Sequence, residues 1–141
     1  MKTRVLFICV HNAFRSQIAE AYLNHLAGDK FEAESAGMKA TEVNPLAVKV
    51  MAEDGIDISH KKAHSVFDYF KEGRFYGYII SVCSDAENEG CPIFPGMSQR
   101  LSWSFDDPSK FTGTIEEKLE QIRKIRDQIK EKIKAFIKEA Q

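Results

Sequence analysis

Apolar residues follow two patterns along the chain. Short apolar or alternating runs predict strands, and apolar residues that recur at helical spacing predict helices. Four segments have the composition of strands: residues 4–8, 31–35, 75–83 and 100–105. Three segments have helical character: residues 16–27 before Gly28, residues 45–54 between the N-cap Asn44 and Gly55, and the chain after Thr114. Residues 4–8 are continuously apolar, which is typical of a strand buried on both faces of a sheet.

The last helix carries the clearest signals. Thr114 and Glu117 have the spacing of a capping box. Apolar residues then recur at helical spacing: Leu119, Ile122, Ile129, Ile133, Phe136 and Ile137. Such a stripe is typical of a helix packed on a core, and a partner-binding face is the alternative.

Strands that alternate with helices imply a parallel sheet with right-handed crossovers. We therefore expect an α/β fold, a three-layer doubly wound sandwich around a four-stranded parallel sheet. A chain of 141 residues is long enough to bury a core. We expect residues 1–141 to form a single domain.

Composition and charge narrow the classes of function. The chain is 43% hydrophobic, but no apolar run approaches the ~20 residues of a membrane span, and no secretion signal is visible. The net charge of −1 gives no electrostatic reason to bind nucleic acid or an anionic membrane. We expect a cytoplasmic monomer without nucleic-acid or membrane partners.

The three cysteines are Cys9, Cys83 and Cys91. An odd number without a secretion signal argues against a structural disulfide framework. Their spacing matches no zinc pattern, so we expect no metal site and no bound cofactor. Free cysteines most often behave as small buried apolar residues. Their position in the fold has to decide whether these three also have a chemical role.

Polar residues follow several of the predicted strands. Cys9, Ser35 and Cys83 end strands, and Asp106 and Asp107 come directly after another. Because the carboxyl ends of parallel strands meet at one edge, ligands bind there and residues distant in sequence can converge.

The segment "CVHNAFRS", residues 9–16, joins the first strand to a helix. Backbone N–H groups that curl into a helix N-terminus form an anion-binding nest. We expect this nest, from Val10 through His11, Asn12, Ala13 and Phe14, to bind an oxyanion together with Arg15 and Ser16. The arginine offers a planar fork for two oxygens, and the same positive field favours a Cys9 thiolate.

Two residues of this segment also have ordinary structural interpretations. Ser16 can donate a hydrogen bond to the sulfur, or it is simply a first-turn hydroxyl. Asn12 can fix the shape of the loop by bonding its own backbone, as turn asparagines do.

Five segments together resemble one family: "CVHNAFRSQIAEAY", "ESAG", "NPLAVKVMAEDGIDIS", "VCSDAENEGCP" and "WSFDDPS". They resemble the thioredoxin-coupled arsenate reductases, which are built on the low-molecular-weight protein tyrosine phosphatase fold. The resemblance implies that Cys9 attacks arsenate and that Cys83 then attacks Cys9 and releases arsenite. Cys91 would next attack Cys83, and thioredoxin would reduce the resulting disulfide.

The resemblance also assigns a general acid. Asp107 matches the family's aspartate before proline, and Asp106 is the competing candidate. Between Cys83 and Cys91 the chain is polar and contains glycine, which suits a segment that rearranges to form a disulfide. The alternative is a mobile surface loop with an incidental Cys91.

Some members of the family bind potassium beside the loop. Asn12, Glu20 and Ser35 match three of the ligands, but no carboxylate follows Lys62, so potassium binding is doubtful here. We hypothesise instead that the Lys62 ammonium neutralises Glu20. The loop also departs from the family at Val10, His11 and Phe14, and His11 is a candidate extra anion ligand.

Two other functions fit part of the pattern. A phosphatase acting on phosphotyrosine or aryl phosphates would use the same loop, with phosphate or sulfate as ligand analogues. It needs neither Cys83 nor Cys91, and the family's phosphatases usually carry tyrosine where this chain has Ser109. A non-catalytic oxyanion-binding module is the third possibility, and the intact Cys9, Arg15 and Asp107 argue against it.

Overall fold

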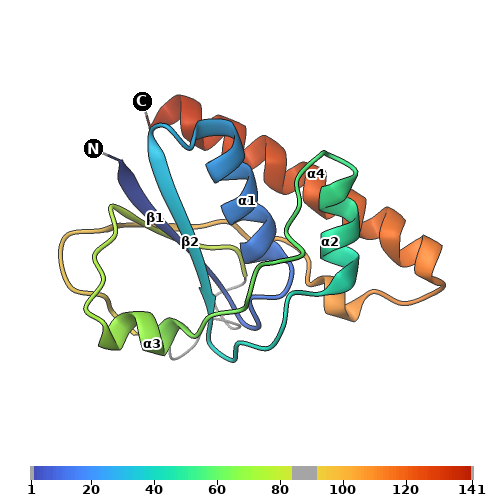
Figure 1. Cartoon of the computed structure of the whole chain (residues 1–141), viewed down its shortest axis with the longest axis horizontal. Coiled ribbons are helices and arrows are strands. Elements are labelled where there is room, and N and C mark those ends of the chain that lie inside the picture. The colour runs from blue at the N-terminus through green and yellow to red at the C-terminus, as the bar shows by residue number, and fades with distance from the viewer. Residues whose placement is uncertain (1, 84–91, 141) are drawn as a thin grey trace.

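Four strands form one parallel sheet in the computed structural model, which describes residues 2–83 and 92–140. The strands are β1 (Thr3–Cys9), β2 (Phe31–Gly37), β3 (Tyr78–Ser81) and β4 (Gln99–Ser102). They lie in the order β2-β1-β3-β4, and every neighbouring pair is parallel. Figure 1 shows β1 and β2 side by side. The predicted parallel sheet is therefore confirmed, with β1 at its interior.

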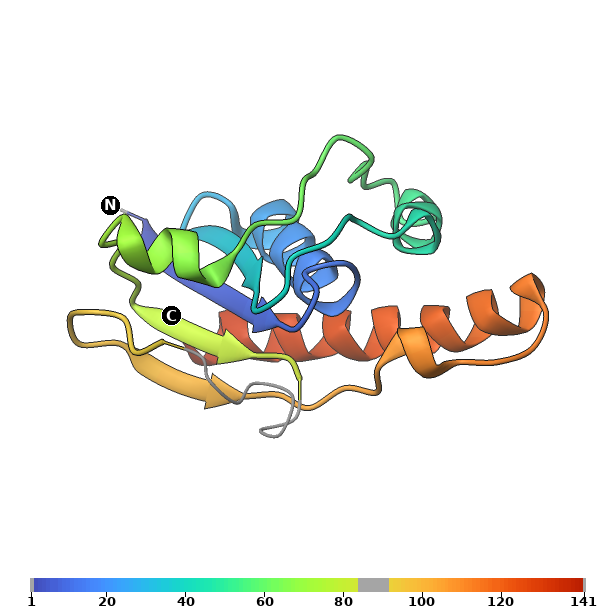
Figure 2. The same cartoon turned by 90° about the horizontal axis from the view of Figure 1, so that it is seen from below.

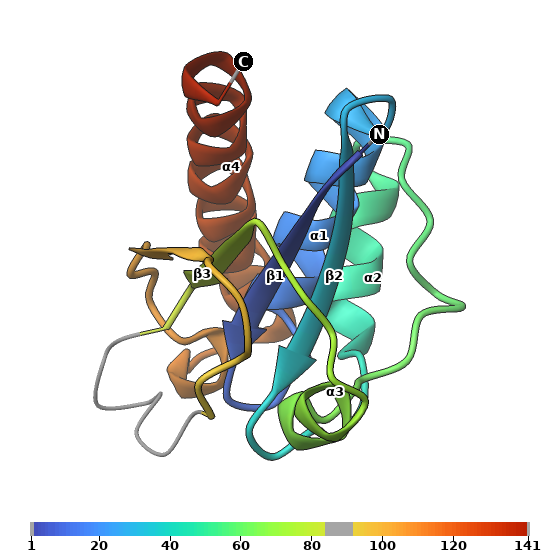
Figure 3. The same ribbon diagram turned by 90° about the vertical axis from the view of Figure 1, so that its left-hand side faces the viewer.

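Helices cover both faces of the sheet. They are α1 (Arg15–Ala27), α2 (Pro45–Ala52), α3 (Val66–Lys71) and α4 (Ile115–Glu139). Figures 2 and 3 show α1, α2 and α4 on one side of the strands and α3 on the other. This arrangement confirms the predicted three-layer α/β fold. None of the helices in the described residues combines the length and apolar composition needed to cross a bilayer.

Strand β1 divides its side chains between the two layers. Val5, Phe7 and Cys9 belong to the core shared with α1 and α4, whereas Leu6 and Ile8 belong to the smaller core beneath α3. All five are buried, because successive side chains of a strand point to opposite faces of a sheet covered on both sides. This alternation directs Cys9 toward the layer that contains the start of α1.

The apolar stripe of α4 packs into the larger core. Leu119, Ile122, Ile129 and Ile133 are each no more than 1% exposed. Phe136 lies among three other rings, with centroid separations of 5.5, 5.0 and 5.7 Å to Phe31, Tyr78 and Trp103. The predicted capping box at Thr114 is also present. The stripe is therefore a core face.

Three local expectations differ from the structure. Helix α3 was not predicted, because Phe67 and Phe70 are about two-fifths exposed and its six residues show no clear apolar stripe. The predicted strands at 75–83 and 100–105 are shorter, since β3 and β4 pair with each other over only four residues. Beyond Ser102 the chain leaves the sheet toward the start of α1.

Two isoleucines on α4 allow a matched test of this packing. Ile133 is fully buried, whereas Ile115 is 63% exposed at the first position of the helix. Ile133→Ala is expected to lower the free energy of unfolding by about 2–5 kcal/mol, because it leaves a cavity in the core. Ile115→Ala is expected to change it by about 0.5 kcal/mol or less in the same urea denaturation experiment. Equal losses would contradict the placement of α4.

Candidate active site

The loop between β1 and α1, residues 10–14, wraps around the Cys9 sulfur. Asn12 is fully buried and adopts a left-handed backbone conformation with φ of 56°. This conformation is uncommon for a residue with a side chain. It directs the Asn12 backbone N–H at the Cys9 Sγ, 3.2 Å away. The loop therefore supplies a backbone donor to the sulfur.

A second donor comes from the first turn of α1. Ser16 Oγ lies 3.0 Å from the Cys9 Sγ. The Asn12 Nδ2 donates to the same hydroxyl oxygen at 2.6 Å, which leaves the Ser16 hydrogen available for the sulfur. Because hydrogen bonds to the charged form favour that form, this arrangement stabilises a thiolate.

The sulfur of Cys9 is also hydrogen-bonded to a second thiol. This hydrogen bond from Cys83 is the largest influence that lowers the pKa of Cys9, to about 6. Burial opposes the shift, while Ser16 and the nearby charge of Arg15 add to it. Cys83 is itself fully buried at the end of β3. At neutral pH the Cys9 side chain is therefore mainly a thiolate in contact with the Cys83 thiol.

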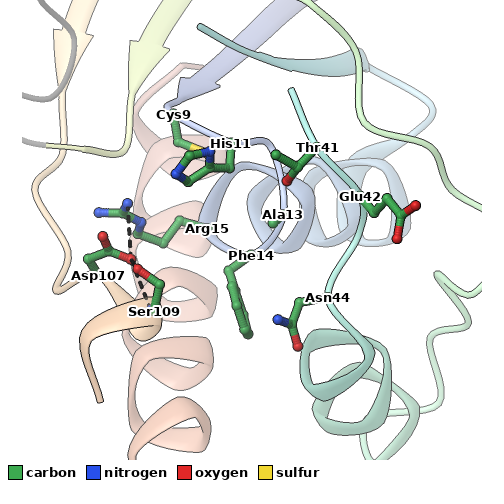
Figure 4. A pocket seen from close by; sticks show the side chains of 10 residues that line it. All are labelled: Cys9, His11, Ala13, Phe14, Arg15, Thr41, Glu42, Asn44, Asp107 and Ser109. Carbon is green, nitrogen blue, oxygen red and sulfur yellow. Dashed lines mark hydrogen bonds and ion pairs between the residues drawn. The ribbon is translucent and has the colours of Figure 1, made fainter. Parts of the chain in front are cut away.

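A cavity of about 280 Å³ opens in front of this thiolate (Figure 4). Its lining comes from the β1–α1 loop with its flanking residues, from the segment before α2, and from the chain around Pro108: Cys9, His11, Ala13, Phe14, Arg15, Thr41, Glu42, Asn44, Asp107 and Ser109. Helix α1 begins at the cavity, and no described side chain caps its N-terminus. Its first N–H groups and positive dipole end therefore suit an anion.

Arg15 and Asp107 face each other at one side of the cavity (Figure 4). The Arg15 Nη2 lies 3.7 Å from the Asp107 Oδ1, and the Arg15 Nη1 donates to the Phe105 carbonyl at 3.1 Å. Asp107 caps the short 3₁₀ turn Pro108–Lys110 by accepting hydrogen bonds from the Ser109 N–H and hydroxyl, at 3.0 and 2.8 Å. Asp106 is exposed and lies outside the cavity lining, so Asp107 is the aspartate at the site.

Comparison with known proteins places this geometry in a family. The model of the low molecular weight phosphotyrosine protein phosphatase family matches residues 4–141. The chain belongs to this family.

Several similar proteins and solved structures are named as arsenate reductases. An arsenate reductase from Shouchella clausii is 40% identical, over 96% of this chain and 95% of that protein. A solved arsenate reductase in the phosphate binding state has a TM-score of 0.76 and 30% identity, and the match covers 99% of this chain and 98% of that one. A thioredoxin-dependent arsenate reductase from Corynebacterium glutamicum has a TM-score of 0.64 and 33% identity, over 95% of this chain and 63% of that one.

The residue that neutralises Glu20, one of the residues matching the family's potassium ligands, differs from the one in our hypothesis. The Glu20 carboxylate accepts a hydrogen bond from the Ser35 hydroxyl at 2.8 Å and forms an ion pair with Lys61. The hypothesis named Lys62, and this is wrong: the Lys62 side chain is exposed, and only its backbone carbonyl faces α1. The side chains of neighbouring residues outside a helix point in different directions. Moving by one position along the chain therefore changes which of the two lysines reaches Glu20.

The Lys61 pair also bears on potassium itself. Both oxygens of Glu20 are engaged, one by the Ser35 hydroxyl and one by the Lys61 ammonium. This donor set does not fit a potassium ion bound through Glu20.

The remaining predicted site residues have distinct surroundings. His11 lines the cavity while its Nδ1 lies 3.2 Å from the Lys39 carbonyl oxygen. Phe14 is buried and also forms a wall of the cavity. Val10 is half-buried and packs on the core rather than lining the cavity. Cys91, predicted to complete the relay, lies outside the described residues.

The segment before α2 was not predicted to line the site. Its backbone is fastened to the β1–α1 loop, because the N–H groups of Thr41 and Asn44 donate to the carbonyls of His11 and Ala13, both at 3.1 Å. The Asn44 side chain caps α2 as predicted, and Glu42 joins the lining. These are backbone contacts between distant segments, and no residue pattern in the sequence indicates them.

The lowered pKa of Cys9 predicts how its reactivity depends on pH. Only the thiolate is alkylated, so the rate at Cys9 should rise with pH, reach half its maximum near pH 6 and level off above it. Ser16→Ala removes one donor to the thiolate and should move this midpoint upward by about one pH unit. The rate is measured with iodoacetamide, by mass spectrometry of the peptide that contains Cys9.

A matched serine provides the control for this experiment. Ser98 donates to the Tyr76 carbonyl at 2.7 Å and lies outside the cavity lining. Ser98→Ala should keep the wild-type midpoint. A wild-type midpoint above pH 8, or equal shifts in the two variants, would contradict the thiolate assignment.

Proposed function

We propose that this protein reduces arsenate to arsenite through a relay of Cys9, Cys83 and Cys91, with thioredoxin as the final reductant. The observation that carries the proposal is a pair of buried thiols at one edge of the sheet, beside a cavity suited to an oxyanion. Cys9 ends β1 and Cys83 follows the neighbouring strand β3, where the Val82 N–H donates to the Ile8 carbonyl at 3.0 Å. Hydrolysis of a phosphate ester needs only one thiolate. A reductase needs a second thiol next to the first, because two thiols supply the two electrons of the reduction.

The first step joins arsenic to Cys9. Arsenate is bound by the N–H groups at the start of α1 and by Arg15, which offers two parallel donors to two oxygens. The Cys9 thiolate attacks arsenic, and an oxygen leaves as water after receiving a proton. Asp107 lies beside Arg15 at one side of the cavity and is the candidate donor of that proton. The product is an S–As bond with arsenic still pentavalent.

The second step reduces arsenic. Cys83 gives its proton to an oxygen of the bound arsenic, and the resulting thiolate attacks the Cys9 sulfur and forms the Cys9–Cys83 disulfide. The S–As bond breaks, and its electron pair remains on arsenic, which leaves as arsenite. The pairing of β1 with β3, which ends next to both cysteines, supports this role for Cys83. Two thiols thus supply the two electrons of the reduction.

The third step restores Cys9. We propose that Cys91 attacks Cys83, which releases Cys9 as a thiolate and transfers the disulfide to Cys83–Cys91. Cys9 is a good leaving group because the Ser16 hydroxyl and the charge of Arg15 still favour its thiolate, and a thiol with a lowered pKa leaves more easily. A thioredoxin dithiol then reduces the Cys83–Cys91 disulfide. This cycle requires a reducing compartment, which supports a cytoplasmic location for the protein.

Slow hydrolysis of aryl phosphates is a second candidate activity. The same nest, thiolate and arginine suit phosphate as well as arsenate. The cavity of about 280 Å³, walled by Phe14, is large enough to admit more than a single tetrahedral oxyanion. The relay cysteines play no part in this hydrolysis, so it separates the two functions experimentally.

Single cysteine variants test the relay. Turnover of arsenate is followed by NADPH oxidation with thioredoxin and thioredoxin reductase, and a parallel assay follows p-nitrophenyl phosphate. Cys9→Ser should abolish both activities, because both begin at this thiolate. Cys83→Ser and Cys91→Ser should lose arsenate turnover at least a hundredfold and keep the phosphatase activity.

The three variants act as controls for one another, since each makes the same change of sulfur to oxygen. Normal arsenate turnover by Cys91→Ser with thioredoxin would contradict the third step. Normal turnover by Cys83→Ser would contradict the relay as a whole.

A further inference from the structure

Gln17 is a buried polar residue with no part in the chemistry above. It lies in the first turn of α1 and is 1% exposed. Its Nε2 lies 3.2 Å from the Asn12 carbonyl oxygen, 3.0 Å from the Asn12 Oδ1 and 3.1 Å from the Lys62 carbonyl oxygen. Its Oε1 has no hydrogen-bond partner among the described residues. The side chain therefore acts as a donor, and mainly toward Asn12.

Asn12 is the residue of the loop that most needs such support. Among the described residues it is the only one besides glycine with positive φ, a conformation that costs free energy for a residue with a Cβ atom. Its Oδ1 accepts hydrogen bonds from the Gln17 Nε2 and from the His64 N–H, the latter at 2.9 Å. These bonds hold the Asn12 side chain on one side of the loop.

The orientation of Asn12 determines what reaches Cys9. With this backbone conformation the Asn12 N–H lies 3.2 Å from the sulfur, and its Nδ2 donates to the Ser16 hydroxyl that also meets the sulfur. If Asn12 relaxed to negative φ, its N–H would turn away from the sulfur and its amide would leave Ser16. Two of the donors to the thiolate, the Asn12 N–H and the Ser16 hydroxyl, thus depend on this one residue.

We infer that Gln17 is a positioning residue that holds Asn12 in the left-handed conformation and thereby keeps two hydrogen-bond donors on the Cys9 sulfur. Gln17 is not among the residues that line the cavity. The inference rests on the proposed function only in taking Cys9 as the reacting thiol. A buried glutamine that served stability alone would leave the reactivity of Cys9 unchanged, and this difference can be measured.

The test is the pH profile of Cys9 alkylation by iodoacetamide in Gln17→Met, read by mass spectrometry of the Cys9 peptide. Methionine has a similar length and volume and donates no hydrogen bond. The midpoint is expected to rise by about one pH unit, which lowers the thiolate fraction about tenfold at pH values below the midpoint. A wild-type midpoint in folded Gln17→Met would overturn the inference.

Tyr22→Phe is the matched control for stability. Tyr22 is buried on the same helix, and its hydroxyl donates to the Asp54 Oδ2 at 2.6 Å, away from the loop. This variant should lower the melting temperature, as Gln17→Met does, and keep the wild-type midpoint. A midpoint raised equally in Tyr22→Phe would show a general effect of destabilisation and would also overturn the inference.

Asn12→Gly provides a second arm, because glycine adopts positive φ without support. Adding Gln17→Met to Asn12→Gly should move the midpoint by less than half of its effect in the wild type. If Gln17→Met alone does not fold, the comparison is made between Asn12→Gly and the double variant, and a shift of a full unit contradicts action through Asn12. Alkylation uses no arsenate, so a failure of the proposed function appears separately, as absent arsenate turnover with a normal alkylation profile.

Discussion

A buried thiolate is the constraint on which the rest of the site depends. Cys9 is 3% exposed, and a charge so far from water is stable only when hydrogen bonds replace its hydration. The chain supplies these bonds by placing Cys9 at the end of the interior strand β1, directly before a tight loop and a helix N-terminus. The left-handed Asn12, the Ser16 hydroxyl and the Cys83 thiol all follow from this requirement.

The requirement extends to residues that never touch the sulfur. A Cβ atom on Gly37, at the end of β2, would lie 2.6 Å from the Val10 carbonyl oxygen and 2.9 Å from the Asn12 nitrogen, so only glycine lets the two segments approach. Helix α2 follows the segment that forms another wall of the cavity. It is held against α4 by Glu53, whose carboxylate binds Arg123 and Arg126 at 2.9 and 2.7 Å. The loop and the cavity are therefore supported from both neighbouring elements.

The sequence predicts elements best where one physical signal is strong over many residues. The continuous apolar run of β1 and the long stripe of α4 are such signals. Helix α3 is too short and too exposed to produce one, and its place beside the sheet depends on packing. Within the site, Cys9 and Arg15 could be predicted because the loop joins a strand to a helix. The ion pair of Glu20 with Lys61, rather than Lys62, depends on how a segment without regular structure turns, and sequence patterns do not specify this.

The most direct test of the account is the disulfide formed after a single turnover. The Cys91→Ser variant is reduced, freed of reductant and mixed with excess arsenate; arsenite is quantified and the cysteines are mapped by mass spectrometry. The account predicts one arsenite per chain and a disulfide between Cys9 and Cys83, because these thiols are already in contact and the relay stops there. Arsenite release without this disulfide, or an unmodified Cys83 beside an oxidised Cys9, would contradict it.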